Sequence, residues 1–362
     1  MSGPHDLPAP GDESPRLFGE SPKQLDASPG PRDGSRGPRG ESPDSAPHAG
    51  PRFDEPVPHG GYRWHYLDAV TDDGSLGIVI IAMVGNPFSP AYARARSRGA
   101  VAEPWRYTSM NVAVYGRGRR ESAWALAERP QRSGTARPGR LELGPSAMEW
   151  ESGRLVVTLD ERTTPLAGFR RPVRGRVVFH PDTVCAEPIF LDAAREHRWW
   201  PIAPRGWVEV DLAEPALRFA AHGYLDANLG LSPLDRSFDH WCWSRGRVRD
   251  GAIITYDATL ADGSRAHRAL RVARDGACSP LEGLVRSSMG LTSWGIPRHV
   301  ATDGARPSRL RSLEDGPFYA REVWQAELAG ERTVVVHETL SGRRLRRSWV
   351  KLCTGYRMRV DG

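Results

Sequence analysis

The sequence predicts an all-β protein built from antiparallel sheets. From Phe53 to the end of the chain, short runs of β-branched and aromatic residues alternate with Asp-Gly, Ser-Gly or Pro-containing turns. The 38 glycines and 31 prolines argue against a helical bundle, and 362 residues exceed one typical domain, so two β domains are expected. The predicted strands include GYRWHYLDAV, LGIVIIAMV, YTSMNVAVYG, RLVVTLDE, GRVVFHP, GWVEVDL, AIITYDATL and RTVVVHETL.

The N-terminal residues 1–52 are predicted to form a disordered tail. They are rich in Pro, Gly, Ser, Asp and Arg, and the first 50 carry a single aromatic residue, Phe18, so they cannot bury enough apolar surface to offset their ordering entropy. The segment lacks the apolar region of a secretory signal. The longest apolar run, Leu76 to Val84, is far shorter than the roughly 20 residues of a spanning helix. We therefore expect a cytoplasmic protein without a transmembrane segment.

Two segments after the tail have helix-like patterns. PFYAREVWQAEL, residues 317–328, places apolar residues near helical spacing and is the best helix candidate, and ESAWALAE, residues 121–128, is interpreted as one or two helical turns. The spread of the strands places the domain junction near residues 210–217. The predicted β domains are therefore residues 53–212 and 213–362.

The charge and the cysteines exclude several functions. The formal net charge is +6 and only Lys23 and Lys351 are lysines, but the arginines are scattered along the chain among 44 acidic residues, so nucleic acid is not the expected partner. The four cysteines are far apart, with no CxxC motif and no His-paired spacing. This spacing indicates neither a metal site nor a disulfide framework, and it fits a reducing cytoplasm.

Two motifs are difficult to explain as scaffold alone. In HRWWPIAP, residues 197–204, adjacent Trp199 and Trp200 point to opposite faces of a regular strand. In HGYLDANLG, residues 222–230, Tyr224 and Asp226 share one face. The structural alternative is that the tryptophan pair packs under a loop and that Asp226 caps a turn.

A third cluster, FDHWCWSR at residues 238–245, places Trp241 and Trp243 on one strand face, with Tyr256 and Asp257 in the next strand. These aromatic rings are either core or the wall of an apolar pocket. Rows of aromatic rings suit a cavity for a long unsaturated hydrocarbon. His240 is interpreted as a surface or hydrogen-bonded core histidine, because no partner spacing indicates metal ligation.

Seven motifs in order resemble the carotenoid 1,2-hydratase family, also called hydroxyneurosporene synthase. They are GYRWHYLDAV (61–70), GNPFSPAYARAR (85–96), MNVAVYG (110–116), HRWWPIAP (197–204), HGYLDANLG (222–230), WCWSR (241–245) and LEDGPFYAR (313–321). The resemblance runs from about residue 59 to the end. It departs from the family pattern at Trp64-His65, where two adjacent tryptophans are frequent, and at Cys242, where an acidic residue is common.

The resemblance implies two lipocalin-like antiparallel β-barrel domains in tandem and a reaction that needs no cofactor. It further implies acid-catalysed addition of water to the terminal C1–C2 double bond of acyclic carotenoids such as lycopene and neurosporene, giving a tertiary alcohol. Such an alkene has no carbonyl to polarise. The reaction therefore needs a strong acid to protonate C2, aromatic faces to stabilise the cation at C1, and a base to deprotonate the attacking water.

The resemblance places the catalytic set on His197, Trp199, Tyr224 and Asp226. Asp226 is the candidate acid because an apolar cavity raises the pKa of a carboxyl group. Trp199 and Tyr224 offer ring faces to the cation, and His197 either orients Asp226 or takes a proton from water. The candidate pocket wall consists of Trp200, Trp241, Trp243, Tyr256 and Asp257.

The expected partners are an acyclic carotenoid, water and a membrane surface. Carotenoids reside in bilayers, so peripheral association with the inner membrane is expected. The basic stretch 342–351, GRRLRRSWVK, is interpreted as a solvated face, with contact to anionic lipid as the alternative. Two other functions remain open: a lipocalin-like carrier without catalysis, and cation chemistry that ends in isomerisation or cyclisation without added oxygen.

Overall fold

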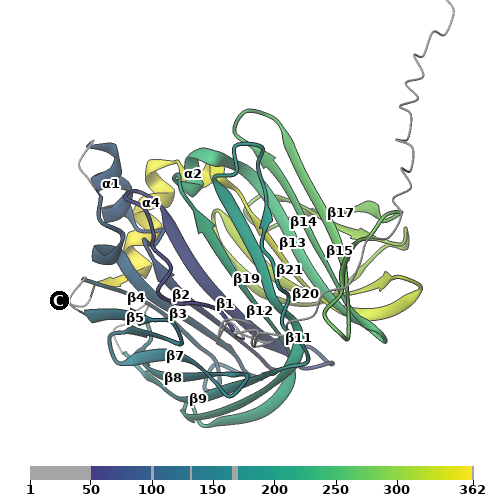
Figure 1. The fold of residues 1–362 in the computed structure, drawn as a ribbon, viewed down its shortest axis with the longest axis horizontal. Helices are drawn as coiled ribbons and strands as arrows, with labels where there is room; N and C mark the ends of the chain where they lie inside the picture. Colours follow the sequence, from purple (N-terminus) through teal and green to yellow (C-terminus); the bar gives the residue numbers. More distant parts are fainter. Residues whose placement is uncertain (1–49, 99–101, 131–132, 165–169, 361–362) are drawn as a thin grey trace, which may run out of the picture. The chain divides into compact units, whose positions relative to one another are not determined.

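Antiparallel strands make up most of the chain in the computed structural model, which describes residues 50–98, 102–130, 133–164 and 170–360. All but the last three residues of the predicted tail, 1–52, lie outside these ranges. The all-β prediction is confirmed for the described residues (Figure 1).

The larger of the two main sheets contains thirteen described strands, in the spatial order β22-β4-β3-β2-β1-β12-β11-β9-β8-β7-β6-β5, with β10 also paired to β11. These strands are β1 (Tyr62–Val70), β2 (Gly77–Val84), β3 (Thr108–Tyr115), β4 (Ala123–Arg129), β5 (Gly134–Arg137), β6 (Arg140–Leu143), β7 (Ser146–Glu151), β8 (Arg154–Arg162), β9 (Pro172–Pro181), β10 (Ile189–Phe190), β11 (His197–Glu214), β12 (Leu217–Gly230) and β22 (Arg359–Val360).

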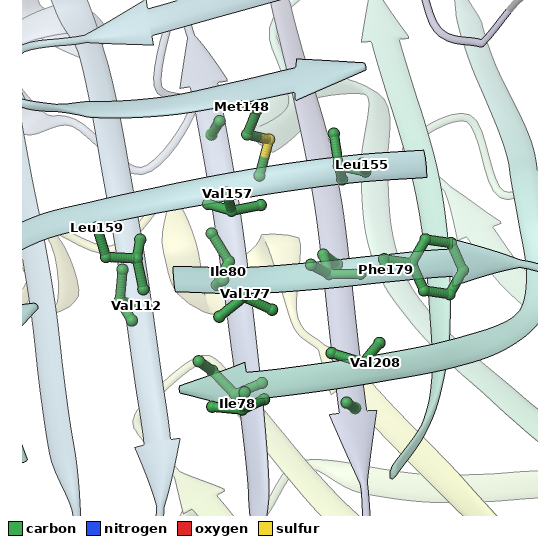
Figure 2. Close-up of a cluster of buried hydrophobic side chains, with 14 of the residues drawn as sticks. Ile78, Ile80, Val112, Met148, Leu155, Val157, Leu159, Val177, Phe179 and Val208 are labelled. Carbon is green, nitrogen blue, oxygen red and sulfur yellow. The ribbon is translucent and has the colours of Figure 1, made fainter. Parts of the chain in front are cut away.

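This sheet folds over on itself and encloses an apolar core. Side chains from β2 and β3 meet side chains from β8, β9 and β11 across it, and Figure 2 shows the two sets of strands crossing with the cluster between them. Ile78 and Ile80 point into this core, whereas Val79 between them packs in a second cluster on the other face. Burial on both faces explains why LGIVIIAMV is an unbroken apolar run rather than an alternating one.

The smaller sheet has the order β16-β15-β14-β13-β21-β20-β19, and a separate pair, β17 with β18, lies beside it. The strands are β13 (Phe238–Val248), β14 (Gly251–Leu260), β15 (Arg265–Ala273), β16 (Cys278–Pro280), β17 (Val285–Leu291), β18 (Pro297–Thr302), β19 (Ser308–Asp315), β20 (Tyr319–Leu328) and β21 (Glu331–Leu340).

One apolar layer contains residues of both main sheets. Tyr66 of β1 and Tyr224 of β12 come from the larger sheet, and Trp243 of β13 and Tyr256 of β14 come from the smaller one. Because side chains alternate along a strand, the opposite face of β13 and β14 points away from this layer. Ile253 on that face packs in a third apolar cluster beside β18. The layer between the sheets holds the candidate site described below.

The helices are short: α1 (Pro90–Ser97), the 3-10 helix η1 (Pro104–Tyr107), α2 (Leu234–Ser237), α3 (Gly342–Leu345) and α4 (Ser348–Arg357). Ser89 caps α1 by accepting a hydrogen bond from the Tyr92 backbone N–H, and Pro90 occupies the first helical position, where no N–H is needed. Among the described residues, no helix has both the length and the apolar character needed to cross a bilayer.

Both helix predictions are wrong. Residues 319–328 form strand β20, and Ala123–Arg129 form β4. Strand β20 is buried on both faces: Val323 packs between the sheets, and Trp324 packs in the cluster beside β18. A strand with two buried faces loses the period of two that identifies it in a sequence, and its apolar residues then mimic a helical spacing.

The predicted junction between residues 212 and 213 falls in the hairpin of β11 and β12, where Leu212 pairs with Leu217. Strand β12, assigned by that division to the second domain, also pairs with β1 in the larger sheet. The division into two domains stays a prediction.

Candidate active site

Asp226 lies on β12, directly opposite Tyr66 of β1, and its side chain enters the layer between the two sheets. The residue is only 5% exposed. Its Oδ2 accepts hydrogen bonds from Tyr224 OH at 2.9 Å and from Trp199 Nε1 at 3.0 Å. Its Oδ1 has no hydrogen-bond partner among the described residues. One oxygen is therefore anchored and the other is available for chemistry.

Burial raises the pKa of Asp226 to about 8. The hydrogen bonds from Trp199 and Tyr224 favour the carboxylate and lower the pKa, whereas the nearby charges of Glu338 and Asp68 raise it further. Desolvation is the largest of these effects, so the acid is mostly protonated at neutral pH. Because Oδ2 already accepts two hydrogen bonds, the acidic proton resides on Oδ1.

Aromatic rings from both sheets surround this carboxyl group. The Trp243 ring centroid lies 5.0 Å from that of Tyr224 and 5.7 Å from that of Tyr66. On the other side, Tyr256 lies 5.4 Å from Trp199 and 6.2 Å from Trp241. This lining offers several π faces to a cation in a site from which water is largely excluded.

His197, at the start of β11, is buried but makes no hydrogen bond to Asp226. Its Nδ1 shares a hydrogen bond of 3.0 Å with Tyr62 OH, and its Nε2 shares one of 3.1 Å with Ser232 Oγ. Burial lowers its pKa, although Asp192 and Glu196 oppose this, so the imidazole is neutral near pH 7. A neutral ring can accept a proton. The observed partners of His197 are Tyr62 and Ser232, so His197 does not orient Asp226 through a direct hydrogen bond.

Two predicted pocket residues lie away from Asp226. Trp200 packs against the core of the larger sheet and donates a hydrogen bond from Nε1 to the Cys185 carbonyl at 2.8 Å. As their adjacent positions on a strand predict, Trp199 and Trp200 point to opposite faces. Asp257 pairs with His299 and Arg286, and its neighbour on β14, Tyr256, points the opposite way into the layer.

A polar network that was not predicted from the sequence lies beside the site. Tyr66 OH donates to Asp68 Oδ2 at 2.9 Å and also lies 2.8 Å from Glu338 Oε1. Arg245 pairs with Asp68, and Arg321 pairs with Glu338 at 2.8 Å. The period of two in GYRWHYLDAV, which places Tyr66 and Asp68 on one face, was the available signal.

A buried carboxyl group with a raised pKa lies among aromatic rings within a strand-rich fold, an arrangement suited to acid chemistry on an apolar, electron-rich substrate. Comparison with known proteins identifies the family. Residues 80–360 match the family Carotenoid hydratase CrtC, and the chain belongs to this family.

The chain is 42% identical over 321 residues to the acyclic carotenoid 1,2-hydratase of Thiocapsa roseopersicina, covering 88% of this chain and 78% of that protein. It is 40% identical over 313 residues to the enzyme of the same name from Rubrivivax gelatinosus, covering 85% and 75%. A crystal structure of an AttH candidate from Nitrosomonas europaea shares the fold, with a TM-score of 0.51, 13% identity, and coverage of 85% of this chain and 99% of that one.

Proposed function

We propose that this protein is an acyclic carotenoid 1,2-hydratase of carotenoid biosynthesis, a hydro-lyase that adds water across the terminal C1–C2 double bond of lycopene- or neurosporene-type substrates. Its family and its named relatives support this function. The observation that carries the mechanism is the unpartnered, buried Oδ1 of Asp226. Purified protein mixed with lycopene in detergent should yield a pigment heavier by one water per modified end, and an unchanged mass would refute hydration.

The first step is transfer of the Oδ1 proton of Asp226 to C2 of the alkene. The π electrons form the new C–H bond, C1 becomes a tertiary carbocation, and Asp226 becomes a carboxylate. Tyr224 and Trp199 continue to donate to Oδ2, so the anion is stabilised as it forms.

The aromatic rings then stabilise the cation. Each ring face of Trp199, Tyr224 or Trp243 contributes about 0.5–2 kcal/mol when water is excluded. Since a factor of ten in rate corresponds to about 1.36 kcal/mol, these contacts assist the acid without replacing it.

Water completes the reaction by attacking C1. We assign the acceptance of its surplus proton to the neutral His197 imidazole, which hydrogen-bonds with Tyr62 and Ser232. The proton then returns to Asp226 by exchange with solvent, so one water is consumed and the enzyme is unchanged.

The acid assignment predicts a specific pH dependence. The acid must be protonated to act, and its pKa is about 8, so kcat/KM should fall about tenfold per pH unit above this value. Initial rates of lycopene hydration measured across the alkaline range would check this.

Tyr224→Phe provides the control for that pH profile. It removes a hydrogen bond that favours the carboxylate, so the pKa of Asp226 rises and the alkaline decline should move upward by about one pH unit. A decline that stays in place in this variant would contradict the assignment of Asp226 as the titrating acid.

The fold supports a finer architectural proposal. The larger sheet around its own core, and the smaller sheet with β17 and β18, correspond to the two lipocalin-like domains that the family resemblance implies. Since β12 pairs within the larger sheet, the boundary of this proposal falls after Gly230 rather than at residue 213.

We also propose that helix α4 contacts the membrane surface. Trp349, Leu352 and Tyr356 follow helical spacing and are exposed, Leu352 by 75% and Tyr356 by 71%. In the segment 342–347 that precedes α4, Arg343 and Arg346 share a single carboxylate, Asp239, which leaves this segment with a net positive charge. Apolar side chains next to basic residues suit the interface of an anionic bilayer, where the substrate resides.

Substitution of Trp349 and Leu352 by serine should weaken binding to anionic vesicles about tenfold, because two apolar side chains no longer enter the interface. Vesicle co-sedimentation measures this, and wild-type binding should fall as salt is raised. Leu310→Ser, at an exposed position on β19, is the matched control and should bind normally. Equal binding by all three proteins would contradict the proposed contact of α4 with the membrane surface.

A further inference from the structure

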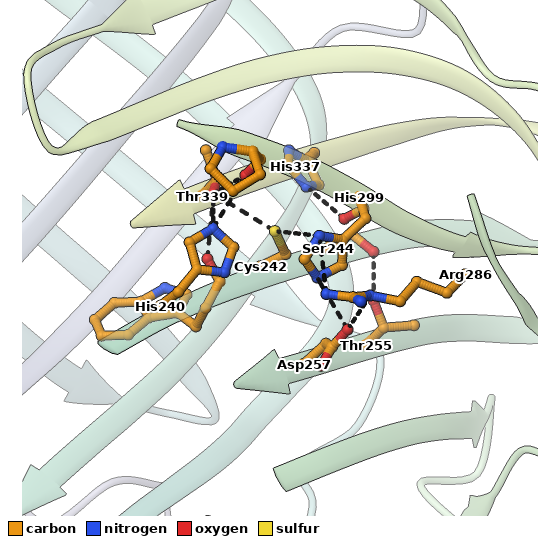
Figure 3. Close-up of polar contacts among 11 residues, drawn as sticks. His240, Cys242, Ser244, Thr255, Asp257, Arg286, His299, His337 and Thr339 are labelled. Carbon is orange, nitrogen blue, oxygen red and sulfur yellow. Dashed lines mark hydrogen bonds and ion pairs between the residues drawn. The ribbon is translucent and has the colours of Figure 1, made fainter. Parts of the chain in front are cut away.

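A second cluster of chemically active side chains lies on the face of β13 opposite the candidate active site. His240 and Cys242 alternate along β13 and therefore share this face, and His299 of β18 approaches it (Figure 3). One potential ligand atom from each of the three residues lies within 4.8 Å of the other two. Two imidazoles and a thiol form a ligand set that suits zinc and similar transition metals.

The spacing of the ligand atoms fits tetrahedral coordination. Cys242 Sγ lies 3.6 Å from His299 Nδ1. A tetrahedral zinc ion about 2.3 Å from sulfur and about 2.0 Å from nitrogen separates those two atoms by about 3.5 Å. Both residues are buried, so their side chains are already held in this arrangement.

The surroundings include the outer partner that metal-binding histidines usually have. With Nδ1 directed to Cys242, the other ring nitrogen of His299, Nε2, lies 2.9 Å from Asp257 Oδ2. Once Arg286, whose Nη2 also contacts this Nε2, turns away, a carboxylate in this position favours the tautomer that leaves Nδ1 free to ligate. Asp257 stands directly opposite Cys242 in the pairing of β13 with β14.

The fourth coordination position is open to solvent. A cleft of about 500 Å³ is lined by His240 and His299 together with Arg286, Arg298 and Arg343, among others. Water from this cleft can complete a tetrahedron with three protein ligands.

Existing contacts of His240 and His299 oppose metal binding. His240 Nε2 lies 3.0 Å from both the Pro297 carbonyl and Thr339 Oγ1, so ligation through Nε2 exchanges these hydrogen bonds for a coordinate bond. Arg286 brings a positive charge to both ring nitrogens of His299, with its Nη2 2.5 Å from Nε2 and 3.2 Å from Nδ1. Its side chain is half-exposed, so it can turn toward solvent when a cation enters. In doing so it gives up its ion pair with Asp257.

We propose that His240, Cys242 and His299 form a site for Zn²⁺ that ties β13 to β18, with Asp257 as its outer carboxylate. On binding, the thiol loses its proton to solvent and the thiolate donates an electron pair to the metal. This inference is independent of hydration, because the three ligands face away from Asp226.

Cobalt substitution tests the site directly. In full-length, tag-free protein carrying Cys278→Ser and Cys353→Ser, which removes the two exposed thiols, one equivalent of Co²⁺ should produce a thiolate-to-cobalt charge-transfer band in the near ultraviolet. Zn²⁺ should abolish the band, and Cys242→Ser in the same background should not develop it. No band in the parent protein, or an equal band after Cys242→Ser, overturns the proposal.

Two further variants keep the test decisive if Cys242→Ser fails to fold. Asp257→Asn should weaken Co²⁺ binding about 10- to 100-fold, the usual effect of removing an outer-shell carboxylate. Arg286→Gln should strengthen it, because a competing cation is removed. Affinities that are unchanged in both variants would place the bound metal elsewhere and overturn the proposal.

Discussion

Asp226→Asn should lower the rate of carotenoid hydration by about 10²- to 10⁴-fold, the usual contribution of a positioned general acid. The amide is nearly isosteric, and its oxygen can accept the hydrogen bonds of Tyr224 and Trp199, so the fold should persist. The amide cannot supply the proton that Oδ1 of the native acid transfers to C2. Lycopene or neurosporene extracted after incubation and analysed by mass measures the effect.

Asp211→Asn is the matched control, since the side chain of this exposed residue of β11 pairs with Arg218 at the surface. It should hydrate at the wild-type rate. Water gained equally by Asp226→Asn would keep the function and remove Asp226 as the essential acid. Tight pigment binding without product, in wild type and variant alike, would favour a carrier.

Arg245→Ala should reduce the free energy of unfolding by about 3–5 kcal/mol, because it leaves a buried carboxylate without its counter-charge. Arg245 lies beside Asp68, whose side chain is wholly buried, and donates to it from Nε at 3.1 Å. The pair joins β1 of the larger sheet to β13 of the smaller one. Denaturant unfolding followed by tryptophan fluorescence provides the measurement.

Two comparisons separate the effect of the unpaired charge from a general sensitivity of the fold to substitution. Arg218→Ala removes one partner of an exposed pair and should leave the unfolding free energy within error of wild type. Asp68→Asn combined with Arg245→Met removes both buried charges and should recover much of the stability, since an unpaired charge costs more than a missing pair. If the double variant is as unstable as Arg245→Ala, the unpaired charge is not the cause.

The fold class could be predicted because most strands carry a local signal. Runs such as RLVVTLDE and RTVVVHETL are rich in β-branched residues and end at turn residues. Strand β20 was not recognised because its side chains are buried on both faces, and the pairing of β12 with β1 was not predicted because strand pairing is a long-range property. Neither burial on the second face nor the choice of partner strand is encoded in local periodicity.

The candidate site was predictable where its residues share one strand face. Tyr224 and Asp226 are two positions apart on β12, and their contact follows from the alternation of a strand. The contribution of Glu338 could not be predicted, because its contact with Tyr66 spans 272 residues of sequence. The proximity of His240, Cys242 and His299 could not be predicted for a similar reason. Spacing rules describe ligands that are close in sequence, whereas Cys242 and His299 lie on two strands and 57 residues apart.

The different environments of the two Asp226 oxygens have a stereochemical consequence. Because Oδ2 is held by two donors and Oδ1 alone is unpartnered, the proton leaves from one fixed position, and an alkene bound in one orientation receives it on one face. In deuterium oxide the acid exchanges its proton for deuterium, and C2 of the product becomes a chiral CHD centre. The label should therefore have a single handedness, whereas protonation by bulk acid would give a racemic mixture at that carbon.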